Sequence, residues 1–369
     1  MKGCGSAVSG AEFDAADGRS PLQTHEGVPI MSEFIEAPAT PAFQNRTTLL
    51  VTFGVIQICL GLLAGLLAVL VIIAGLATIT MMEEAAAQQG MQAGSIVMGG
   101  LIYGLIGAWF ISMGYGSFKA RRWARSLTLA ASWIGLVCGG LGTLSMLFFM
   151  GDMMEQMERQ GNMPPGTGKL MAVVMFMFSF VIYILIPGTL LLIYGGKNVK
   201  ATCEYTNPEP SWTDACPLPV LIQAVLLGSY SLLILSMAAY HWATPFFGTV
   251  LTGVPGAVAI LSFALCCAVL ARGCYRLHPL AWWGTIAMAL FWGTSAFLTF
   301  SRGDLMGFYT AMGIPEKQLE AMRPLIEGGT MQSIVLWATP LWGCLLLGFF
   351  VCTKRYFVGR NGDTVNPLD

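Results

Sequence analysis

Eight long apolar runs follow one another beyond Arg46, and they constrain the fold more than any other feature of the chain. They cover residues 47–80, 96–117, 127–150, 171–195, 218–241, 254–271, 281–300 and 331–352. A membrane-spanning helix needs about 20 predominantly apolar residues, and most of the runs reach that length. Because a backbone in lipid must satisfy its own hydrogen bonds, runs this long and dense predict helices rather than barrel strands. The sequence therefore predicts an all-α integral membrane protein with eight transmembrane helices.

The composition agrees with a membrane protein and disfavours other classes. The chain has 369 residues, of which 55% are hydrophobic and 11% are charged, whereas a soluble domain is about 25% charged. Mean hydropathy is +0.67. The net charge is -1, without a strongly basic block, so nucleic acid is not an expected partner. The expected partner is the lipid bilayer.

Matching landmarks in the two halves of the chain predict an internal duplication. Trp123 and Trp133 lie ten residues apart, as do Trp282 and Trp292, and both pairs are related by an offset of 159 residues. Two further pairs follow the same order with different offsets, namely Gln57 with Gln223 and Pro187 with Pro340. Since each half would hold an even number of helices, the two four-helix units are expected to be parallel repeats.

These landmarks divide the chain into five regions. We expect a disordered cytoplasmic N-terminal tail, a first four-helix repeat, a cytoplasmic connector, a second four-helix repeat and a cytoplasmic C-terminal tail, at residues 1–46, 47–200, 201–217, 218–353 and 354–369. With the N-terminus inside, 14 Lys and Arg residues fall in inner segments and five in outer loops. The positive-inside rule therefore predicts a plasma-membrane protein with both termini cytoplasmic. In that reducing compartment, Cys203 and Cys216 of the connector should be free thiols.

Gln57 and Gln223 are the best candidates for buried polar residues. Each lies near the start of an apolar run and at an equivalent position of the expected repeat. The two side chains could meet near the pseudo-axis and line a polar site. Alternatively, each could hydrogen-bond across a helix contact, which is the commoner use of a glutamine in lipid and is worth roughly 0.6–2 kcal/mol. The sequence leaves both interpretations open and favours the second.

Pro187 and Pro340 lie near the middle of the fourth and eighth runs. A proline inside a helix removes one backbone hydrogen bond and kinks the helix, and the kink is either a hinge or a fixed bend. Small residues at a spacing of four also allow close helix packing. They are found at Gly61/Gly65, Gly100/Gly104 and Gly135/Gly139.

Groups that carry chemistry are scarce in the sequence. The apolar runs contain no Asp, Glu, Lys or Arg, and such groups mark proton relays and ion paths in membranes. The chain has no P-loop, GxGxxG or HExxH motif and no CxxC pair, so no catalytic, cofactor-binding or metal-binding residue is assigned. A transporter coupled to protons or sodium is therefore disfavoured, whereas a carrier of neutral molecules is not.

A methionine-rich stretch follows the third run. Met150, Met153, Met154 and Met157 recur at the spacing of one helix face. Thioethers bind Cu(I), but they also fill irregular apolar contacts. We expect this stretch and the other outer connectors, residues 81–94 and 303–322, to form an extracytoplasmic cap over the helix ends.

Three functional hypotheses remain. The sequence mildly favours a non-enzymatic scaffold or accessory subunit that packs against a membrane-protein partner or a second copy of itself. The alternatives are a transporter or channel for a neutral or hydrophobic solute, and copper handling through the methionine face.

Overall fold

The computed structural model describes residues 43–81, 93–146, 150–151, 167–302, 305–327 and 329–358. Within these ranges, eight helices are long and apolar enough to cross a membrane. The predicted all-α class with eight transmembrane helices is therefore confirmed. Most of the two expected tails, residues 1–42 and 359–369, lie outside the described residues.

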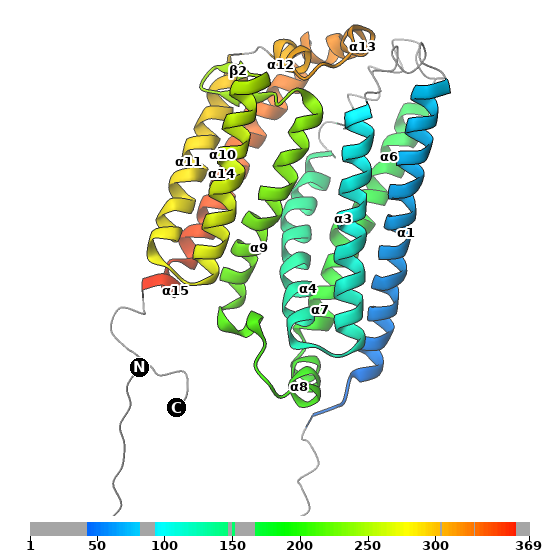
Figure 1. The fold of residues 1–369 in the computed structure, drawn as a ribbon, viewed down its shortest axis with the longest axis vertical. Coiled ribbons are helices and arrows are strands. Elements are labelled where there is room, and N and C mark those ends of the chain that lie inside the picture. Colours follow the sequence, from blue (N-terminus) through cyan, green and yellow to red (C-terminus); the bar gives the residue numbers. More distant parts are fainter. Residues whose placement is uncertain are drawn as a thin grey trace, which may run out of the picture. The chain divides into compact units, whose positions relative to one another are not determined.

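The first four spans form one group of neighbouring helices (Figure 1). They are α1 (Thr47–Met81), α3 (Ala93–Phe118), α4 (Arg122–Ile134) with its continuation through the π-helical turn η1 (Gly135–Gly139) to Met146, and a fourth span built of α6 (Thr167–Phe180), the π-helical turn η2 (Val181–Leu185) and α7 (Ile186–Gly195). Two short elements then form the connector, α8 (Lys197–Thr206) and the 3-10 turn η3 (Trp212–Ala215).

The last four spans form a second group, which includes the small β-structure of the described chain. They are α9 (Leu218–Leu233) with the 3-10 turn η4 (Ile234–Tyr240), α10 (Gly253–Tyr275), α11 (Pro279–Ser301) and α14 (Thr330–Thr353). The shorter elements are strands β1 (Thr244–Phe246) and β2 (Thr249–Leu251), and helices α12 (Leu305–Ala311), α13 (Glu316–Glu327) and α15 (Arg355–Val358).

The spans begin and end within a few residues of the predicted runs, and the largest difference at a start is in the third span. That helix begins at Arg122, whereas the predicted apolar run begins at residue 127. Arg122 and Arg125 therefore lie in the first turns of a membrane helix. A long arginine side chain is tolerated there because it can reach the interface while its stem packs against apolar neighbours.

Short elements occupy both ends of the helix groups. Figure 1 shows α8 and α15 at one end, below called the α8 end, and α12 and α13 at the other, below called the hairpin end because the β-hairpin lies there as well. The expected outer connector 303–322 thus contributes two short helices at the hairpin end. The remaining parts of the expected cap fall largely outside the described residues.

The turn between α10 and α11 shows how the sequence sets a helix boundary. Leu277 has a φ of 57°, a left-handed conformation that stops α10. The backbone N–H groups of Leu277 and His278 donate to the carbonyls of Cys274 (2.8 Å) and Gly273 (2.9 Å), which satisfies the last turn. Pro279 then opens α11, where its missing N–H is not needed.

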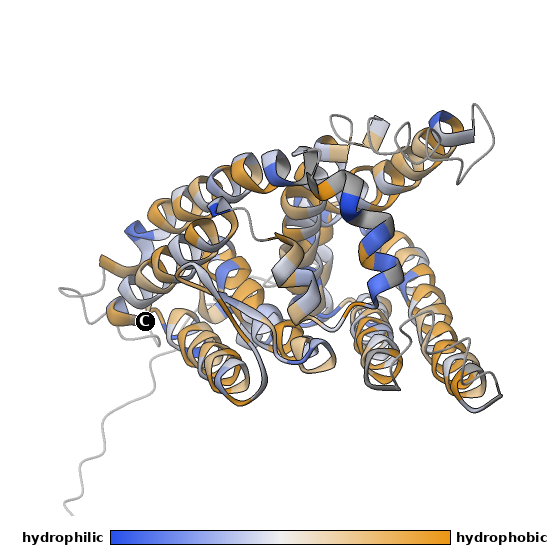
Figure 2. Cartoon of the chain, turned by 90° about the horizontal axis from the view of Figure 1, so that it is seen from above, coloured by the Kyte–Doolittle hydropathy of each residue, from blue (hydrophilic) through white to orange (hydrophobic). Residues whose placement is uncertain are grey.

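The long helices consist largely of hydrophobic residues, coloured orange in Figure 2, and many of these residues are exposed on the structure. On α6, for example, Leu170, Val173 and Phe178 are exposed. A helix that is hydrophobic all round cannot face water over such a length. This surface therefore fits a hydrocarbon environment, in agreement with a multi-pass membrane protein.

Helices α1 and α3 approach each other more closely than any side chain would allow. A Cβ atom added to Gly61 would lie 2.8 Å from the carbonyl oxygen of Gly107, and one added to Gly107 would lie 2.8 Å from that of Gly61. Seven residues away on each helix, Gly54 and Gly114 face each other in the same way, with a Cβ on Gly54 only 2.8 Å from the Gly114 oxygen. The contact is a glycine seam with a period of seven residues.

This seam corrects part of the predicted small-residue spacing. A Cβ on Gly65 or on Gly104, the second glycine of each of two expected pairs, would meet nothing within 4 Å. The repeat that closes α1 against α3 is therefore seven residues rather than four. Gly135 and Gly139 do lie on one helix contact, because both face the fourth span. Gly135 faces Pro187 and Gly139 faces Tyr183.

The β-hairpin after α9 is not predicted by the sequence, because its strands lie in a partly apolar segment just beyond the fifth run, which ends at residue 241. The strands pair antiparallel, with Phe246 opposite Thr249. Phe247 has a φ of 42°, and its N–H donates to Ser295 Oγ (3.0 Å), while the N–H of Gly248 donates to Thr299 Oγ1 (3.0 Å). Hydroxyl groups on α11 thus satisfy the backbone of the hairpin tip.

Candidate functional site

Gln57 lies in a buried polar cluster within the first group of helices. Its Oε1 accepts a hydrogen bond from Ser117 Oγ of α3 (3.4 Å), and the hydroxyl of Tyr194 in α7 donates to the same Ser117 Oγ (2.9 Å). All three side chains are buried. The cluster therefore links the first, second and fourth spans.

Gln223 lies in a similar cluster within the second group. Its Oε1 accepts a hydrogen bond from Thr353 Oγ1 at the end of α14 (2.9 Å), and its Nε2 donates to Cys274 Sγ in α10 (3.4 Å). Thr285 of α11 lies 3.6 Å from the same sulfur. Gln223 is fully buried. Its amide group lies where α9, α10, α11 and α14 meet.

The two glutamines are therefore held in separate places. Each has its hydrogen-bond partners inside its own group of helices, and Ser117 and Cys274 stand at corresponding ends of the second span in each group. None of the pockets described below is lined by Gln57 or Gln223. These contacts are those of polar side chains that join helices.

The prolines differ in their surroundings. Pro187 is buried and lies two residues after the end of the π-helical turn η2, where widening of the helix relieves the clash that a proline causes with the preceding turn. This turn packs against η1 of the third span. Pro340 lies inside α14. A kink at Pro187 or Pro340, and a hinge at either residue, remain predictions.

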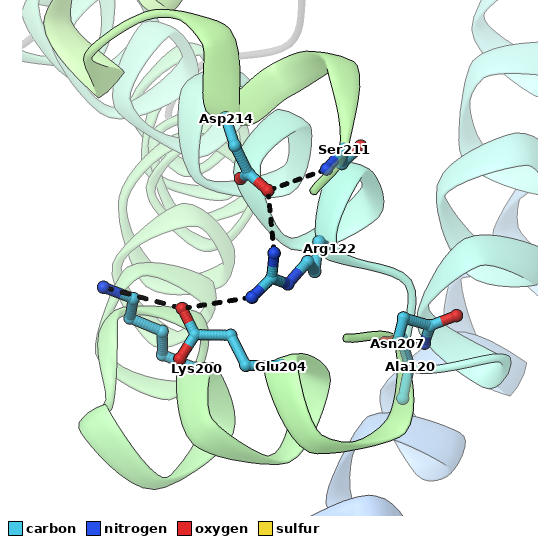
Figure 3. Close-up of polar contacts among 7 residues, drawn as sticks. All are labelled: Ala120, Arg122, Lys200, Glu204, Asn207, Ser211 and Asp214. Carbon is cyan, nitrogen blue, oxygen red and sulfur yellow. Dashed lines mark hydrogen bonds and ion pairs between the residues drawn. The ribbon is translucent and has the colours of Figure 1, made fainter. Parts of the chain in front are cut away.

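A group of paired charged side chains lies at the α8 end, where α4, α8 and η3 meet (Figure 3). The Arg122 guanidinium lies between two carboxylates, with Nη1 at 3.4 Å from Asp214 Oδ2 and Nη2 at 3.8 Å from Glu204 Oε1. Lys200 Nζ is 3.7 Å from the same Glu204 oxygen. We call these residues, together with Arg125 and Thr213, the basic pocket.

Local structure fixes each member of the basic pocket. Asp214 accepts a hydrogen bond from the Ser211 backbone N–H (2.9 Å) in a capping box that starts η3. Lys200 and Glu204 are one turn apart on α8. The Asn207 amide, just beyond α8, donates to the Ala120 carbonyl (2.9 Å) and so ties α8 to the turn that precedes α4.

Arg125 lies deeper than Arg122 on the same face of α4. Its Nε donates to the backbone carbonyl of Tyr194 (2.9 Å), one of the carbonyls that the end of α7 leaves free. The two terminal nitrogens of this guanidinium have no partner among the described residues. Arg125 is half-buried, so it holds a positive charge beneath the Arg122 ion pairs.

The pocket has a volume of about 390 Å³ and is lined by all three basic residues. Two of its buried polar atoms have no hydrogen-bond partner in the described structure, namely Arg122 Nε and Thr213 Oγ1. Thr213 is only 2% exposed. An unpaired buried polar group costs about 1–3 kcal/mol, so the pocket retains unmet hydrogen-bonding capacity.

Cys203 and Cys216 flank the basic pocket, and both are buried and unpaired, as expected for free thiols. Burial raises the pKa of each thiol to about 11, and the nearby Arg125 offsets the effect only in part at Cys203. At neutral pH both cysteines are therefore protonated and poorly nucleophilic. They act here as small apolar groups.

The sequence did not point to this pocket. In the sequence, Arg122 and Arg125 contribute only to the Lys and Arg count that predicts orientation, because the third span is expected to start after them. A signal was present, since residues 122, 125 and 126 share one helix face if the helix begins at residue 122. The partners Glu204 and Asp214 lie about 80 to 90 residues away in the connector, and nothing local indicates the pairing.

No metal or cofactor site is assigned. Within the described ranges, no group of three or more His, Cys, Asp and Glu residues could hold a metal ion. The methionine face lies outside the described residues apart from Met150, and its copper hypothesis remains a prediction. Comparisons with protein-family models, curated proteins and solved structures found no match to this chain.

Proposed function

We propose that this chain is a non-enzymatic membrane protein that acts as a scaffold or accessory subunit. One observation supports this choice: the two buried glutamines of the spans are used to join helices. Gln57 and Gln223 each hydrogen-bond within their own helix group, whereas a solute path would need polar groups that remain free to exchange partners. A rigid bundle of this kind suits a protein whose role is to pack against others.

We propose further that the two groups are parallel four-helix repeats. In each group the glutamine of the first span contacts a small residue at the end of the second span, and a hydroxyl residue at the end of the fourth span completes the cluster. Tyr194 donates to Ser117, whereas Thr353 donates to Gln223 itself. The fourth-span residues, Tyr194 and Thr353, are 159 residues apart, the same offset as between the tryptophan pairs. Shared ancestry of the halves explains why one pattern of contacts occurs twice.

The proposed setting is the plasma membrane with the α8 end and both termini in the cytoplasm. The α8 end carries the basic residues of α4, α8 and α15, and cytoplasmic ends of membrane proteins are enriched in Lys and Arg. The proposed partners are the lipid bilayer and either another membrane protein or a second copy of the chain.

The test distinguishes a scaffold role from transport of a solute. The full chain in liposomes should leave permeability to glycerol, urea and glucose at the level of empty liposomes, measured by stopped-flow light scattering. Gln57→Leu and Gln223→Leu should lower thermal stability without affecting permeability. In native membranes, deletion should change the mass of a complex on native gels and lower the abundance of its other subunit. Flux through the wild type that either leucine variant abolishes without lowering stability would refute the proposal.

One observation favours the alternative, a transporter or channel for a neutral or hydrophobic solute. The π-helical turns η1 and η2 face each other in the middle of two neighbouring spans, and such turns are often found at functional sites. If this were a moving joint, Gly139→Ala, whose Cβ would collide with the Tyr183 ring, would change a solute flux. The scaffold proposal expects only a change in stability.

A further inference from the structure

We infer that the basic pocket binds a phosphate group, carried either by a phospholipid headgroup or by a small soluble phosphate. The inference concerns a ligand site and does not depend on whether the chain is a scaffold or a transporter. It rests on three features of the pocket: which hydrogen-bonding groups are unused, what the carboxylates already bind, and where the pocket lies along the spans.

Four of the unused hydrogen-bonding groups around the pocket are able to donate. They are Arg122 Nε, the hydroxyl of Thr213 and the two terminal nitrogens of Arg125. Thr213 is 2% exposed and lines the pocket, so bulk water does not readily reach its hydroxyl. A ligand that satisfies several convergent donors must offer several acceptor oxygens, as a phosphate does.

The carboxylates of the pocket do not exclude an anion, because one oxygen of each is already paired with a cationic side chain. Asp214 Oδ2 accepts from the Ser211 N–H and pairs with Arg122, and Glu204 pairs with both Arg122 and Lys200. They hold Arg122 in place, as Figure 3 shows. With three cationic and two anionic side chains around the pocket, one positive charge is left in excess.

The start of α4 adds to this field. The pocket is lined by residues 122, 125 and 126 of its first turns, and no side chain caps this helix. The N-terminus of a helix carries a partial positive charge and free N–H groups, which favour an anion. The basic side chains and the helix end therefore act in the same direction.

The position of the pocket suits a headgroup. It lies at the boundary where α4 starts and where α8 leaves the last turn of α7. Exposed aromatic residues occur at the same level, with Tyr205 at 69% and Trp212 at 52% exposure. Trp and Tyr concentrate at membrane–water interfaces, so a phospholipid could place its phosphate in the pocket while its chains remain in the bilayer.

The test uses the full chain, purified in detergent and stripped of lipid. Retention of phosphatidylglycerol, and of diacylglycerol as the match without phosphate, is measured by native mass spectrometry. Inorganic phosphate is added separately in a thermal-shift titration, with chloride at equal ionic strength as reference. We expect phosphatidylglycerol to bind at least tenfold more tightly than diacylglycerol if a headgroup is the ligand, or phosphate alone to raise the melting temperature if the ligand is soluble.

Two pocket variants and one control identify the site. Thr213→Val removes an unpaired hydroxyl at nearly constant volume, so the ligand-free protein should be as stable as wild type or more so. Loss of one hydrogen bond to a charged group should weaken binding about tenfold. Arg122→Lys keeps the charge near both carboxylates but removes Nε, with a similar expected loss. Arg121→Gln removes a neighbouring exposed charge that does not line the pocket and should change binding less than about twofold.

The outcomes decide both the site and the source of the phosphate. Lipid binding that Thr213→Val and Arg122→Lys weaken, with no response to inorganic phosphate, supports a headgroup site. A response to inorganic phosphate that the same variants remove supports a soluble ligand. If neither probe binds, or if Arg121→Gln weakens binding as much as the two pocket variants do, the inference is wrong and the cluster only anchors α4 to the connector.

Discussion

Replacing Gly107 by alanine tests the glycine seam between α1 and α3. The added Cβ would lie 2.8 Å from the Gly61 carbonyl oxygen and 3.1 Å from the Gly65 backbone nitrogen. Both neighbours are backbone atoms, so no side chain can rotate away and the two helices must move apart. Gly104 is the matched control, because a Cβ there would meet nothing within 4 Å.

The magnitude follows from the difference between the two variants. Both lie on α3, three residues apart, so the gain in helix propensity from Gly to Ala, about 1 kcal/mol, is nearly common to both. Gly107→Ala carries in addition the strain of an overpacked contact, typically about 1–3 kcal/mol. We therefore expect Gly107→Ala to be less stable than Gly104→Ala by about 1–3 kcal/mol.

The assay is reversible unfolding in mixed micelles of dodecyl maltoside and dodecyl sulfate, followed by tryptophan fluorescence. Gly61→Ala, placed across the seam, should behave like Gly107→Ala, and the double variant should be destabilised by less than the sum of the two because the helices separate only once. If Gly107→Ala and Gly104→Ala unfold within about 0.5 kcal/mol of each other, the reasoning from backbone contact is refuted.

Three further predictions concern other parts of the structure. Thr353→Val removes the donor to the Gln223 carbonyl and should lower the free energy of unfolding by about 1 kcal/mol in the same assay; an unchanged value would contradict a role for this cluster. The thiols of Cys203 and Cys216, with pKa values of about 11, should be about one part in a thousand ionised at pH 8 and resist iodoacetamide in the folded state. Since unfolding returns them to a lower pKa, stability should also fall as the pH rises from about 9 to 11, and replacing both by serine should flatten that part of the profile. Ser295→Ala leaves an N–H of the hairpin tip without its acceptor and should lower stability by about 1–3 kcal/mol, with faster proteolysis of the hairpin as the second readout; equal proteolysis of variant and wild type would count against it.

The spans could be predicted from the sequence because hydrophobicity over some 20 residues is a property of the local chain. The start of the third span could not be predicted, since Arg122 and Arg125 look like charged residues that precede the apolar run until their distant partners are known. The hairpin was missed for a similar reason. Its residues 244–251 are largely apolar and continue the fifth run, and only hydroxyl groups on α11 make a turn stable there.

The candidate sites show the same limit. The two glutamines stand out in the sequence as polar residues in apolar runs, but their partners lie 60 and 130 residues further along the chain, at Ser117 and Thr353. Spacing within a helix predicts which residues share a face. It does not predict which other helix that face will contact, and the ion pairs of Arg122 in the basic pocket are contacts of the second kind.

The glycine seam has a consequence for biosynthesis. Its two helices precede the other six described spans and are neighbours in the sequence, so their contact closes a short loop and requires none of those later spans. The pair is therefore expected to insert and associate as a unit while the remaining six spans are still being synthesised. A substitution that opens the seam should accordingly reduce the yield of inserted protein in cells more than the stability of the purified protein would suggest.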